Sequence, residues 1–453
     1  MAVLVAIAAY VVRILRQPVD VRLKRRQGGP VVVVGGLSLL VFVWLRFTPE
    51  DVGAGYLIGE MCGVSAVFLM TMSLVLATKW RRLEPWFGGL DRMYLWHRGS
   101  AAVAVGLLVV PHAILTTIAP ALEQGVPSGL VGTAGIVLGA ASILGLVALV
   151  AVSYPRVGDL IRLHYGGWLG LHRLTGVLVI FAFLHGLALD DVIAGSTLLW
   201  LIFVGLGTVA TAAYGYTELL MRRLLPAAEA VVSSVRRLSK DTLEVVVQPT
   251  DRAVEVIPGQ FIYLEVRGGA GRREHPFSVA GVLPDGRLRL IVKATGRDTA
   301  LMYERLEPGL TAKVTGPFGM FDHTVGGDRQ IWIAAGVGVA PFLGWLAARP
   351  AGLPARVDFF YVTSSPETAL FADEVDAAGR EHPIVRVHHV RTKESGRLTV
   401  EQIARRATDT GVLDPTIDVF LCGPRPMVDD LAHALGRIGF SRDHVHFELF
   451  AFR

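Results

Sequence analysis

The sequence predicts a multi-domain membrane protein: a bundle of six transmembrane helices, then an antiparallel β-barrel, then an α/β domain with a parallel sheet. Long apolar runs dominate the chain up to Pro226, short β-forming runs separated by turns follow to Phe321, and strand–glycine turn–helix units begin at Gln330. The composition agrees, since 52% of the 453 residues are hydrophobic and only 18% are charged. The expected domain boundaries are 1–29, 30–226, 227–324 and 325–453.

Residues 1–29 are expected to form an interfacial amphipathic helix and a basic linker. Their apolar stretch, Ala2–Val12, precedes the basic residues, which reverses the order found in a secretory signal. The stretch is also short for a membrane span, and this favours a helix that lies in the membrane surface.

Six later runs are long enough to cross about 30 Å of hydrocarbon. They cover residues 31–46, 56–78, 97–119, 129–152, 172–194 and 196–216. Basic residues gather in the loops on one side and acidic residues in the loops on the other, so the positive-inside rule places both termini in the cytoplasm. The chain up to Pro226 carries 17 Lys and Arg against 11 Asp and Glu, and the remainder carries 27 against 28. This basic excess points to the lipid bilayer as a partner rather than to nucleic acid.

Four histidines lie in two of these spans: His97 and His112 in the third, and His172 and His185 in the fifth. Ligand-forming groups are costly inside a membrane and therefore indicate function. Both spans run from inside to outside, so His97 is expected to pair with His172 near the cytoplasmic face, and His112 with His185 nearer the outer face. Two imidazoles occupy both axial positions of a haem iron, so the pattern predicts two bis-histidine b-type haems stacked across the bilayer.

Helix geometry raises an objection to this pairing. A spacing of 15 residues leaves two side chains about 60° apart around a straight helix, and a spacing of 13 leaves them about 140° apart. Pro111, directly before His112, is expected to kink the third span. Histidines that only pack between helices remain the alternative. Arg98 and Arg173 directly follow the two inner histidines and are expected to pair with haem propionates.

Two turns in the α/β domain predict a nucleotide site. The first contains Gly336, Gly338 and Pro341, follows an apolar strand and opens a helix, so backbone N–H groups there can approach a pyrophosphate. A purely structural turn is the alternative. The second, Cys422-Gly423-Pro424, follows another strand at the same edge of the sheet.

The end of the second strand bears on the choice of nucleotide. It carries Ser364 and no acidic residue that would bind a free ribose 2′-hydroxyl. Ser364 and Arg391 are compatible with a 2′-phosphate, which favours NADPH over NADH.

Taken together, residues 30–453 resemble the NADPH oxidase and ferric reductase superfamily, in which a ferric-reductase-like transmembrane domain precedes a ferredoxin-reductase-type FAD and NAD(P)H module. The resemblance implies a prokaryotic member in a bacterial plasma membrane, with FAD bound by the barrel. It assigns to FAD the segment His275-Pro276-Phe277-Ser278, together with Gly296, Thr299 and the C-terminal aromatic residue Phe452. It also assigns the turns at Gly336 and Cys422 to the nicotinamide nucleotide.

The chain departs from the family pattern at two places in the third span. The histidine spacing there is 15, where the family typically has 14, and this puts the depth of His112 in question. Eukaryotic oxidases of the family carry a further histidine one turn beyond the outer ligand, and here that position is Thr116. Superoxide formation is therefore less firmly implied than electron transfer across the membrane.

The expected activity is electron transfer from cytosolic NAD(P)H through FAD and two haems to an outer acceptor, with O₂ reduced to superoxide. Outer-sphere transfer needs no catalytic acid or base, and none is assigned. Phe181 and Phe183 are candidate relays between the haems, although packing is the more ordinary role for such residues. The alternatives are a reductase of ferric or cupric chelates and a donor subunit for a dedicated partner protein. Oligomeric state is not predicted.

Overall fold

The computed structural model describes residues 28–48, 53–118, 129–154, 157, 165–221, 225–268, 273–348, 353–441 and 443–448. The chain divides into two compact units, a helical unit that reaches Leu224 and a second unit that holds the barrel and the α/β domain from Leu225 onward. The interfacial helix predicted within residues 1–29 and the aromatic residue Phe452 lie outside the described residues, except that Gly28 and Gly29 begin the first described helix.

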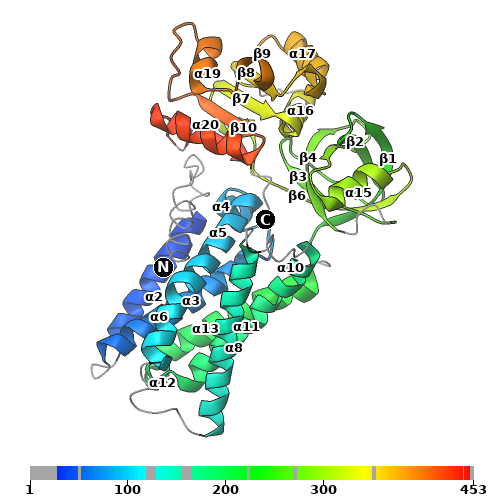
Figure 1. Cartoon of the computed structure of the whole chain (residues 1–453). Helices are drawn as coiled ribbons and strands as arrows, with labels where there is room; N and C mark the ends of the chain where they lie inside the picture. Colours follow the sequence, from blue (N-terminus) through cyan, green and yellow to red (C-terminus); the bar gives the residue numbers. More distant parts are fainter. Residues whose placement is uncertain are drawn as a thin grey trace. The chain divides into compact units, whose positions relative to one another are not determined.

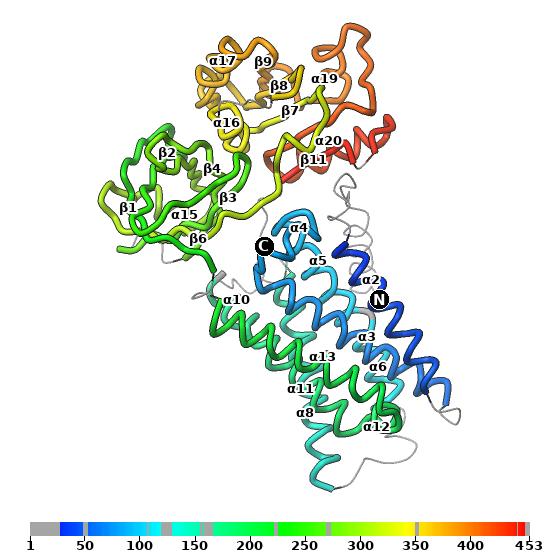
Figure 2. Tube along the Cα trace, turned by 180° about the vertical axis from the view of Figure 1, so that it is seen from behind, coloured from blue at the N-terminus to red at the C-terminus, as the bar shows by residue number. Residues whose placement is uncertain are grey.

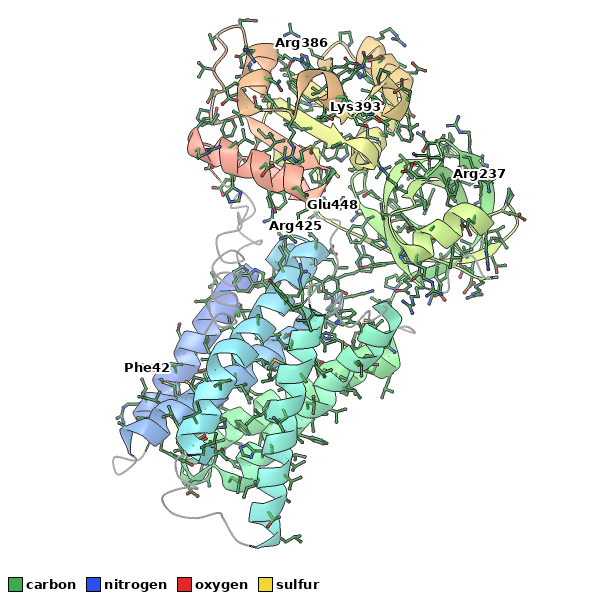
Figure 3. All side chains as sticks on the ribbon, viewed as in Figure 1. Phe42, Arg237, Arg386, Lys393, Arg425 and Glu448 are labelled. Carbon is green, nitrogen blue, oxygen red and sulfur yellow. The ribbon has the colours of Figure 1, made fainter. Side chains whose placement is uncertain are left out.

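The described part of the helical unit contains six helices that are long and apolar enough to span a membrane, which confirms that prediction (Figure 1). The spans are α2 (Gly28–Phe47), α3 (Ala54–Leu76), a third built from α5 (Leu90–Val103), η1 (Ala104–Val109), α6 (Val110–His112) and η2 (Ala113–Ile118), then α8 (Leu130–Ser153), a fifth built from α10 (Tyr165–His172) and α11 (Leu174–Leu189), and α13 (Thr197–Gly215) with η3 (Tyr216–Leu220). Short helices α4 (Glu84–Phe87) and α12 (Asp191–Gly195) lie between spans. Phe42 on α2 is 65% exposed and projects outward in Figure 3, as expected for a side chain that faces lipid.

The third span begins earlier than its hydrophobicity predicts. The helix starts at Leu90, so His97 lies two turns inside it rather than at its first residue. Helical hydrogen bonding does not stop at the edge of the hydrocarbon, and polar residues such as Asp91 and Arg92 simply extend the helix beyond it. His172 likewise ends α10 and lies inside the fifth span instead of opening it.

The barrel of the second unit is closed, with strand order β1-β2-β5-β4-β3-β6 and antiparallel pairing throughout. Its strands are β1 (Ala227–Arg237), β2 (Thr242–Pro249), β3 (Phe261–Val266), β4 (His275–Val282), β5 (Leu288–Lys293) and β6 (Thr311–Phe318), and the helix α15 (Arg297–Arg305) follows β5. Alternate residues such as Val245 and Val247 belong to the barrel core, which matches the predicted alternation. The path of the barrel strands can be followed in Figure 2.

The α/β domain is a five-stranded parallel sheet of order β11-β10-β7-β8-β9, as predicted. The strands are β7 (Arg329–Ala335), β8 (Arg356–Thr363), β9 (Val385–Arg391), β10 (Asp418–Cys422) and β11 (Val445–Glu448), and the main helices are α16 (Ala340–Ala347), α17 (Ala372–Glu381), α19 (Val400–Ala407) and α20 (Arg425–Arg437). Along β7, Trp332 packs with α16 and α17, while Ile331 and Ile333 pack with α19 and α20. The sheet is therefore buried on both faces.

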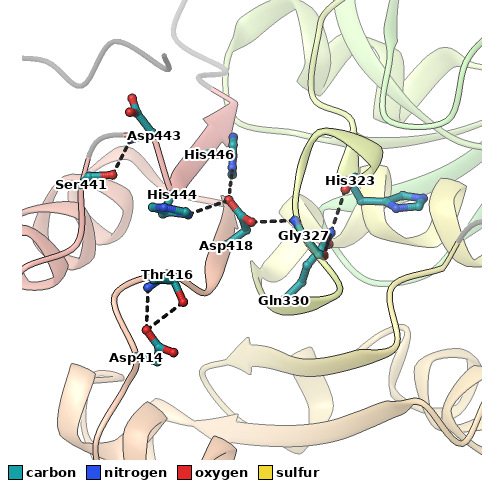
Figure 4. Close-up of polar contacts among 10 residues, drawn as sticks. All are labelled: His323, Gly327, Gln330, Asp414, Thr416, Asp418, Ser441, Asp443, His444 and His446. Carbon is teal, nitrogen blue, oxygen red and sulfur yellow. Dashed lines mark hydrogen bonds and ion pairs between the residues drawn. The ribbon is translucent and has the colours of Figure 1, made fainter. Parts of the chain in front are cut away.

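A buried carboxylate fixes the short edge strand β11 to the sheet. Asp418, which is fully buried, accepts hydrogen bonds from the backbone N–H of Gly327 at 2.7 Å, from His446 Nε2 at 2.9 Å and from His444 Nδ1 at 3.2 Å (Figure 4). His446 also stacks on Phe420 of β10 with ring centroids 4.4 Å apart. These contacts hold the start of β11, whose last residue, Glu448, belongs to the site described below.

Candidate functional site

Each predicted histidine pair comes together within the helical unit. The ring centroids of His97 and His172 lie 6.0 Å apart, and those of His112 and His185 lie 6.1 Å apart. The two rings of each pair are nearly perpendicular, at 80° and 86°. The first pair joins α5 to α10 and the second joins α6 to α11, so both link the third span to the fifth.

The separation of the rings suits a shared iron. Imidazole binds a metal at about 2 Å and its nitrogen lies about 1 Å from the ring centre, so two rings on one metal have centres roughly 6 Å apart. Both pairs have this separation. Among the described residues, no three His, Cys, Asp or Glu side chains lie close enough to hold a metal ion. The remaining ligands would have to come from a macrocycle, and the residues therefore fit a haem better than a bare ion.

Three of the histidines are oriented by backbone carbonyls of neighbouring helices. The contacts are His97 Nδ1 to Ser73 O at 2.8 Å, His112 Nδ1 to Gly59 O at 3.0 Å and His185 Nδ1 to Gly135 O at 2.9 Å. A carbonyl oxygen only accepts, so Nδ1 carries the ring proton in each of them. The lone pair is left on Nε2, which is the nitrogen that a metal then binds.

The groups that contact Nδ1 of the four histidines come from two helices, α3 and α8, and are spaced by nearly whole helical turns. Gly59 and Ser73 lie fourteen residues apart on α3, nearly four turns, and Gly135 and Ser153 lie eighteen apart on α8, five turns. Each pair therefore lies on one face of its helix. As a result, α3 supports both histidines of the third span and α8 supports both histidines of the fifth.

A π-helical stretch accounts for the extra residue between the histidines of the third span. Residues Ala104–Val109 (η1) form a π-helix between His97 and His112. A π-turn contains one more residue than an α-turn, and such turns are frequent at functional sites. The spacing of 15 thus acts as about 14 in α-helical phase. In the fifth span, Arg173 lies between α10 and α11 with helical backbone angles of φ −61° and ψ −26°, and its N–H donates to Leu169 O at 3.1 Å.

Two glycines leave room for the outer pair of rings. A Cβ on Gly63 would lie 2.6 Å from His112 Nδ1, and a Cβ on Gly139 would overlap His185 Nδ1. A cavity of about 310 Å³ lies beside the same rings. Its apolar lining residues include Val64, Val67, Met70, Leu146, Val179 and Phe203. A mostly apolar cavity with two converging imidazoles is the environment that a macrocycle requires.

His172 is held differently from the other three. Its Nδ1 lies 3.5 Å from the hydroxyl oxygen of Ser153, and its face stacks on Trp168 with ring centroids 4.9 Å apart and planes 18° apart. Ser153 Oγ donates to Leu149 O at 2.7 Å and accepts from Trp168 Nε1 at 3.1 Å. The Ser153 hydroxyl therefore contacts both His172 and the Trp168 ring stacked on it. His172 is thus held by side chains, whereas the other three histidines are held by backbone carbonyls.

The other residues predicted for the haem region have structural contacts of their own. Arg98 is half-buried next to His97 on α5. Arg173 Nε lies 3.5 Å from Glu218, and its side chain is 45% exposed. Phe183 is buried against Phe203 with ring centroids 5.1 Å apart, which is a packing contact between α11 and α13. Phe181 is partly buried on the same helix. These contacts favour packing over electron relay for Phe183.

The end of the cavity near the outer pair is acidic, which was not predicted. Glu60 and Asp190 are buried, with 5% and 7% of their surfaces exposed, and both line the cavity. Tyr56 and Asp191 line it with them. Thr116, at the position where the eukaryotic oxidases carry a histidine, donates from its hydroxyl to His112 O at 2.7 Å. The sequence signal for this cluster was Glu60, an acidic residue within an apolar span.

The predicted FAD residues lie along β4 and at the start of α15. His275 opens β4, and its Nε2 atom is buried without a hydrogen bond, 3.5 Å from Asp298. Burial lowers the pKa of His275, and the nearby Asp298 carboxylate opposes that effect. Thr299 Oγ1 accepts from the Gly296 N–H at 3.0 Å and donates to Gly296 O at 3.1 Å, so this hydroxyl closes its own turn. A buried ring nitrogen with a carboxylate neighbour but no hydrogen bond is consistent with a bound ligand at this point.

Ser278 contacts a carboxylate from the far end of the chain. Its hydroxyl donates to Glu448 Oε2 at 3.2 Å, and both residues are buried. Glu448 on β11 is the register partner of Cys422 on β10, and burial raises the pKa of that thiol, with Glu448 adding to the effect. The predicted flavin residue Ser278 and the predicted nucleotide residue Cys422 therefore share a carboxylate neighbour. Glu448 was not assigned from the sequence, although a charged residue ending an apolar strand was a usable signal.

The two glycine turns predicted for the nucleotide touch each other. A Cβ on Gly338 would overlap the carbonyl oxygen of Cys422 and lie 2.8 Å from Gly423 Cα. Gly336 has φ of +54°, a conformation that glycine adopts without strain. Pro341 lies buried at the start of α16, and Pro424 precedes α20. Both turns lie at the carboxyl ends of parallel strands, where such sheets bind ligands.

The predicted 2′-phosphate residues lie at the ends of β8 and β9. Ser364 follows β8, and Arg391 pairs in register with Thr363. The backbone N–H of Lys393 donates to Ser364 O at 3.1 Å, which brings a second cation to this loop. The pKa of Glu367 is lowered chiefly by a hydrogen bond from Ser365. The charges of Lys393 and Arg391 lower this pKa further. Lys393, labelled in Figure 3, was missed because its position depends on the strand register.

Three family comparisons match consecutive parts of the chain. The ferric reductase like transmembrane component matches residues 62–183, an FAD-binding domain matches residues 228–319, and an oxidoreductase NAD-binding domain matches residues 332–433. The first match contains His97, His112 and His172, and His185 lies two residues beyond its end.

Individual relatives match about half of the chain. Ferredoxin–NADP reductase B of Sorangium cellulosum is 29% identical over 236 residues, covering 49% of this chain and 96% of the relative. The reductase component of propane 2-monooxygenase of Rhodococcus jostii is 26% identical over 239 residues, covering 48% of this chain and 62% of the relative. This chain thus spans less than two thirds of the second relative.

Solved structures match a similar share. The ferredoxin reductase in carbazole 1,9a-dioxygenase is 26% identical, with a TM-score of 0.42 over 50% of this chain and 70% of that one. A ferredoxin NADP+ reductase from Neisseria gonorrhoeae is 19% identical, with a TM-score of 0.43 over 49% of this chain and 98% of that one. The three consecutive family matches give this chain the architecture of the ferric reductase and NADPH oxidase type, in which a ferric-reductase-like transmembrane domain precedes FAD-binding and NAD-binding domains, and they indicate an NAD(P)H-dependent oxidoreductase.

Proposed function

We propose that the protein transfers electrons from cytosolic NADPH, by way of FAD and two bis-histidine b-type haems, to O₂ on the outer face of the membrane, forming superoxide. The observation that carries the proposal is the presence of two facing imidazole pairs between the third and fifth spans, each at the separation that one iron requires. When bound, FAD supplies a centre that accepts electrons in pairs and releases them singly, and the haems supply one-electron steps through the lipid.

The chain's own residues hold and orient these groups. Backbone carbonyls on α3 and α8 keep the proton of His97, His112 and His185 on Nδ1 and present Nε2 to the metal. In the second unit, Glu448 orients the hydroxyl of Ser278. Burial raises the pKa of the Cys422 thiol, so this side chain would present a neutral group to a nucleotide bound at its turn.

NADPH is the proposed donor because two cations lie near Ser364. Arg391 is the last residue of β9, and Lys393 follows it. The hydroxyls of Ser364 and Thr368 lie 3.0 Å apart on the loop after β8. Cations and hydroxyls together suit a 2′-phosphate dianion.

Reduction of a cationic metal complex is the second candidate. The cavity beside His112 and His185 is lined by Glu60, Asp190 and Asp191. An exposed carboxylate such as that of Asp191 raises the local concentration of cations and repels anionic chelates. Under this alternative, the rate would depend on the charge of the acceptor complex.

The first experiment is a reduced-minus-oxidised spectrum of the purified protein with NADPH, in air and under argon. We expect two b-type haems for each FAD, and in air a reduction of cytochrome c that superoxide dismutase abolishes. Chelate reduction that persists under argon without a superoxide signal would support the second candidate. A protein that binds FAD but shows no b-type absorbance would contradict both.

The support of His172 by side chains allows a separate prediction. In Ser153→Ala, Trp168 Nε1 and His172 Nδ1 both lose their acceptor, and the less anionic His172 should raise the reduction potential of the inner haem by tens of millivolts. A redox titration of the two haem absorbances should show one shifted and one unshifted centre. Ser38→Ala is the control, since Ser38 also donates to a carbonyl four residues earlier but lies exposed on α2. Equal shifts at both centres, or none, would contradict the role of Ser153.

A further inference from the structure

An arginine of the barrel is bonded to a helix of the α/β domain. Arg289 on β5 forms a two-point contact with Glu374 on α17, with Nη1 to Oε1 at 2.6 Å and Nη2 to Oε2 at 2.8 Å. Its Nε donates to Glu244 on β2 of the barrel at 2.7 Å. The guanidinium group also lies 5.9 Å from the ring centre of Phe371. One side chain therefore connects two barrel strands to the helix that follows β8.

The arginine is the shielded member of this contact. Only 16% of the Arg289 side chain is exposed, against 39% of the Glu374 side chain, and Glu244 behind it is exposed by 14%. Hydrogen bonding to Glu374 and then to Glu244 raises the pKa of Arg289, so it stays charged. Planar two-point contacts between arginine and carboxylate fix direction as well as distance.

The two ends of this contact lie next to the two predicted cofactor sites. On the barrel side, Arg289 is the register partner of Gly281 on β4, three residues after Ser278. On the other side, Glu374 lies six residues after Thr368, whose hydroxyl contacts Ser364 in the 2′-phosphate loop.

The same two domains also meet at a second place. There α16 packs on β4, a Cβ on Gly344 would lie 2.7 Å from Val279 O, and Trp345 Nε1 donates to Pro258 O at 3.1 Å. A packed patch of this kind fixes the distance between two bodies but allows rotation about it. A directional bond away from the patch removes that rotation.

We propose that Arg289 is a positioning residue, which fixes the nucleotide-binding domain on the barrel so that the nicotinamide and flavin rings meet at transfer distance. The proposal depends on the flavin and nucleotide chemistry of the second unit and not on the haems. It goes beyond the proposed function because neither Arg289 nor Glu374 contacts a predicted cofactor residue directly.

The test compares Arg289→Met, Glu374→Gln and the double variant in the full-length protein loaded with FAD. Mixed with NADPH under argon, each variant should show a limiting rate of flavin reduction about tenfold or more below that of the parent protein, since small misplacements of reacting groups are costly. The concentration of NADPH for half-maximal rate and the FAD content should change little. The double variant should be no slower than Arg289→Met alone, because both changes remove one interaction.

Arg236→Met is the matched control. Arg236 pairs with the same Glu244 at 3.0 Å but lies within the barrel and is 65% exposed, so its loss should leave the limiting rate unchanged. Arg289→Lys retains the charge without the planar contact and should fall between Met and the parent protein.

The outcomes separate a positioning role from a structural one. A normal rate in Glu374→Gln would overturn the proposal, because Arg289 would then act only within the barrel. Slow variants that have also lost FAD or melt at lower temperature would likewise count against it. None of these results depends on haem absorbance, so the haem proposal is tested separately.

Discussion

Replacing His112 by leucine should stop electron transfer across the membrane while leaving reduction of the flavin by NADPH intact. Loss of a residue that only orients a ligand costs about 10–100-fold in metal affinity, and loss of the ligand itself costs more. His112 faces His185 at 6.1 Å, and nothing in the cavity lining other than these two rings offers a neutral imidazole to the outer iron.

The measurement uses two acceptors. Ferricyanide reduction, which takes electrons at the flavin, should continue, while superoxide-dismutase-sensitive cytochrome c reduction should fall to background. The spectrum should show one b-type haem for each FAD instead of two. His185→Leu should give the same result, and the double variant should be no worse, because both rings serve one centre.

His433→Leu provides the control for the histidine substitutions. His433 lies exposed on α20, with its Nδ1 2.7 Å from Asp429 O in its own helix. This change should alter neither the spectrum nor either activity. Two haems persisting in both His112→Leu and His185→Leu would contradict the assignment of the outer pair.

Much of the helical unit could be predicted from the sequence because its signals are local. Hydropathy reports the six spans, and loop charge reports which spans run in the same direction. Given parallel third and fifth spans, the rise per residue alone matches His97 with His172 and His112 with His185. The rings do meet in these combinations.

The phase and orientation of those histidines could not be predicted. A π-helix such as that at Ala104–Val109 depends on the packing of the whole bundle. The sequence therefore suggested only a kink at Pro111. The carbonyls that orient Nδ1 belong to residues of almost any type, and a backbone acceptor leaves no mark in the sequence. The start of the third span was also placed too late, because a helix can extend beyond its apolar segment.

In the second unit, too, local features could be predicted from the sequence and contacts between distant segments could not. Alternating apolar residues and glycine turns predicted the barrel and the parallel sheet. Contacts between distant segments were missed: Glu448 reaches Ser278 across 170 residues of chain, and Arg289 reaches Glu374 across 85. Such partners are set by topology, which brings the last strand of the sheet beside the barrel.

Substituting alanine for Gly338 should strongly impair the use of NADPH. A Cβ there would overlap the carbonyl oxygen of Cys422 and lie 2.7 Å from its carbonyl carbon. Both contacts are backbone, so the turn after β7 must move away from the turn after β10, and overpacking of this kind costs about 1–3 kcal/mol. The displaced turns are the two that the sequence assigns to the nucleotide, so we expect the KM for NADPH to rise and kcat to fall, together by about 100-fold in kcat/KM.

Two other glycines separate this effect from the general effect of an added methyl group. Gly336 has open space around its Cβ position but a φ of +54°, so Gly336→Ala should cost about 1 kcal/mol through backbone strain and change kcat/KM only modestly. Gly436 lies in α20 with nothing within 4 Å, and Gly436→Ala should instead stabilise the protein by about 1 kcal/mol. Both the melting temperature and kcat/KM should therefore fall from Gly436→Ala through Gly336→Ala to Gly338→Ala. If Gly338→Ala bound and oxidised NADPH like the parent protein, the close contact of these two turns would have no part in nucleotide binding, and the site would have to lie elsewhere on the sheet edge.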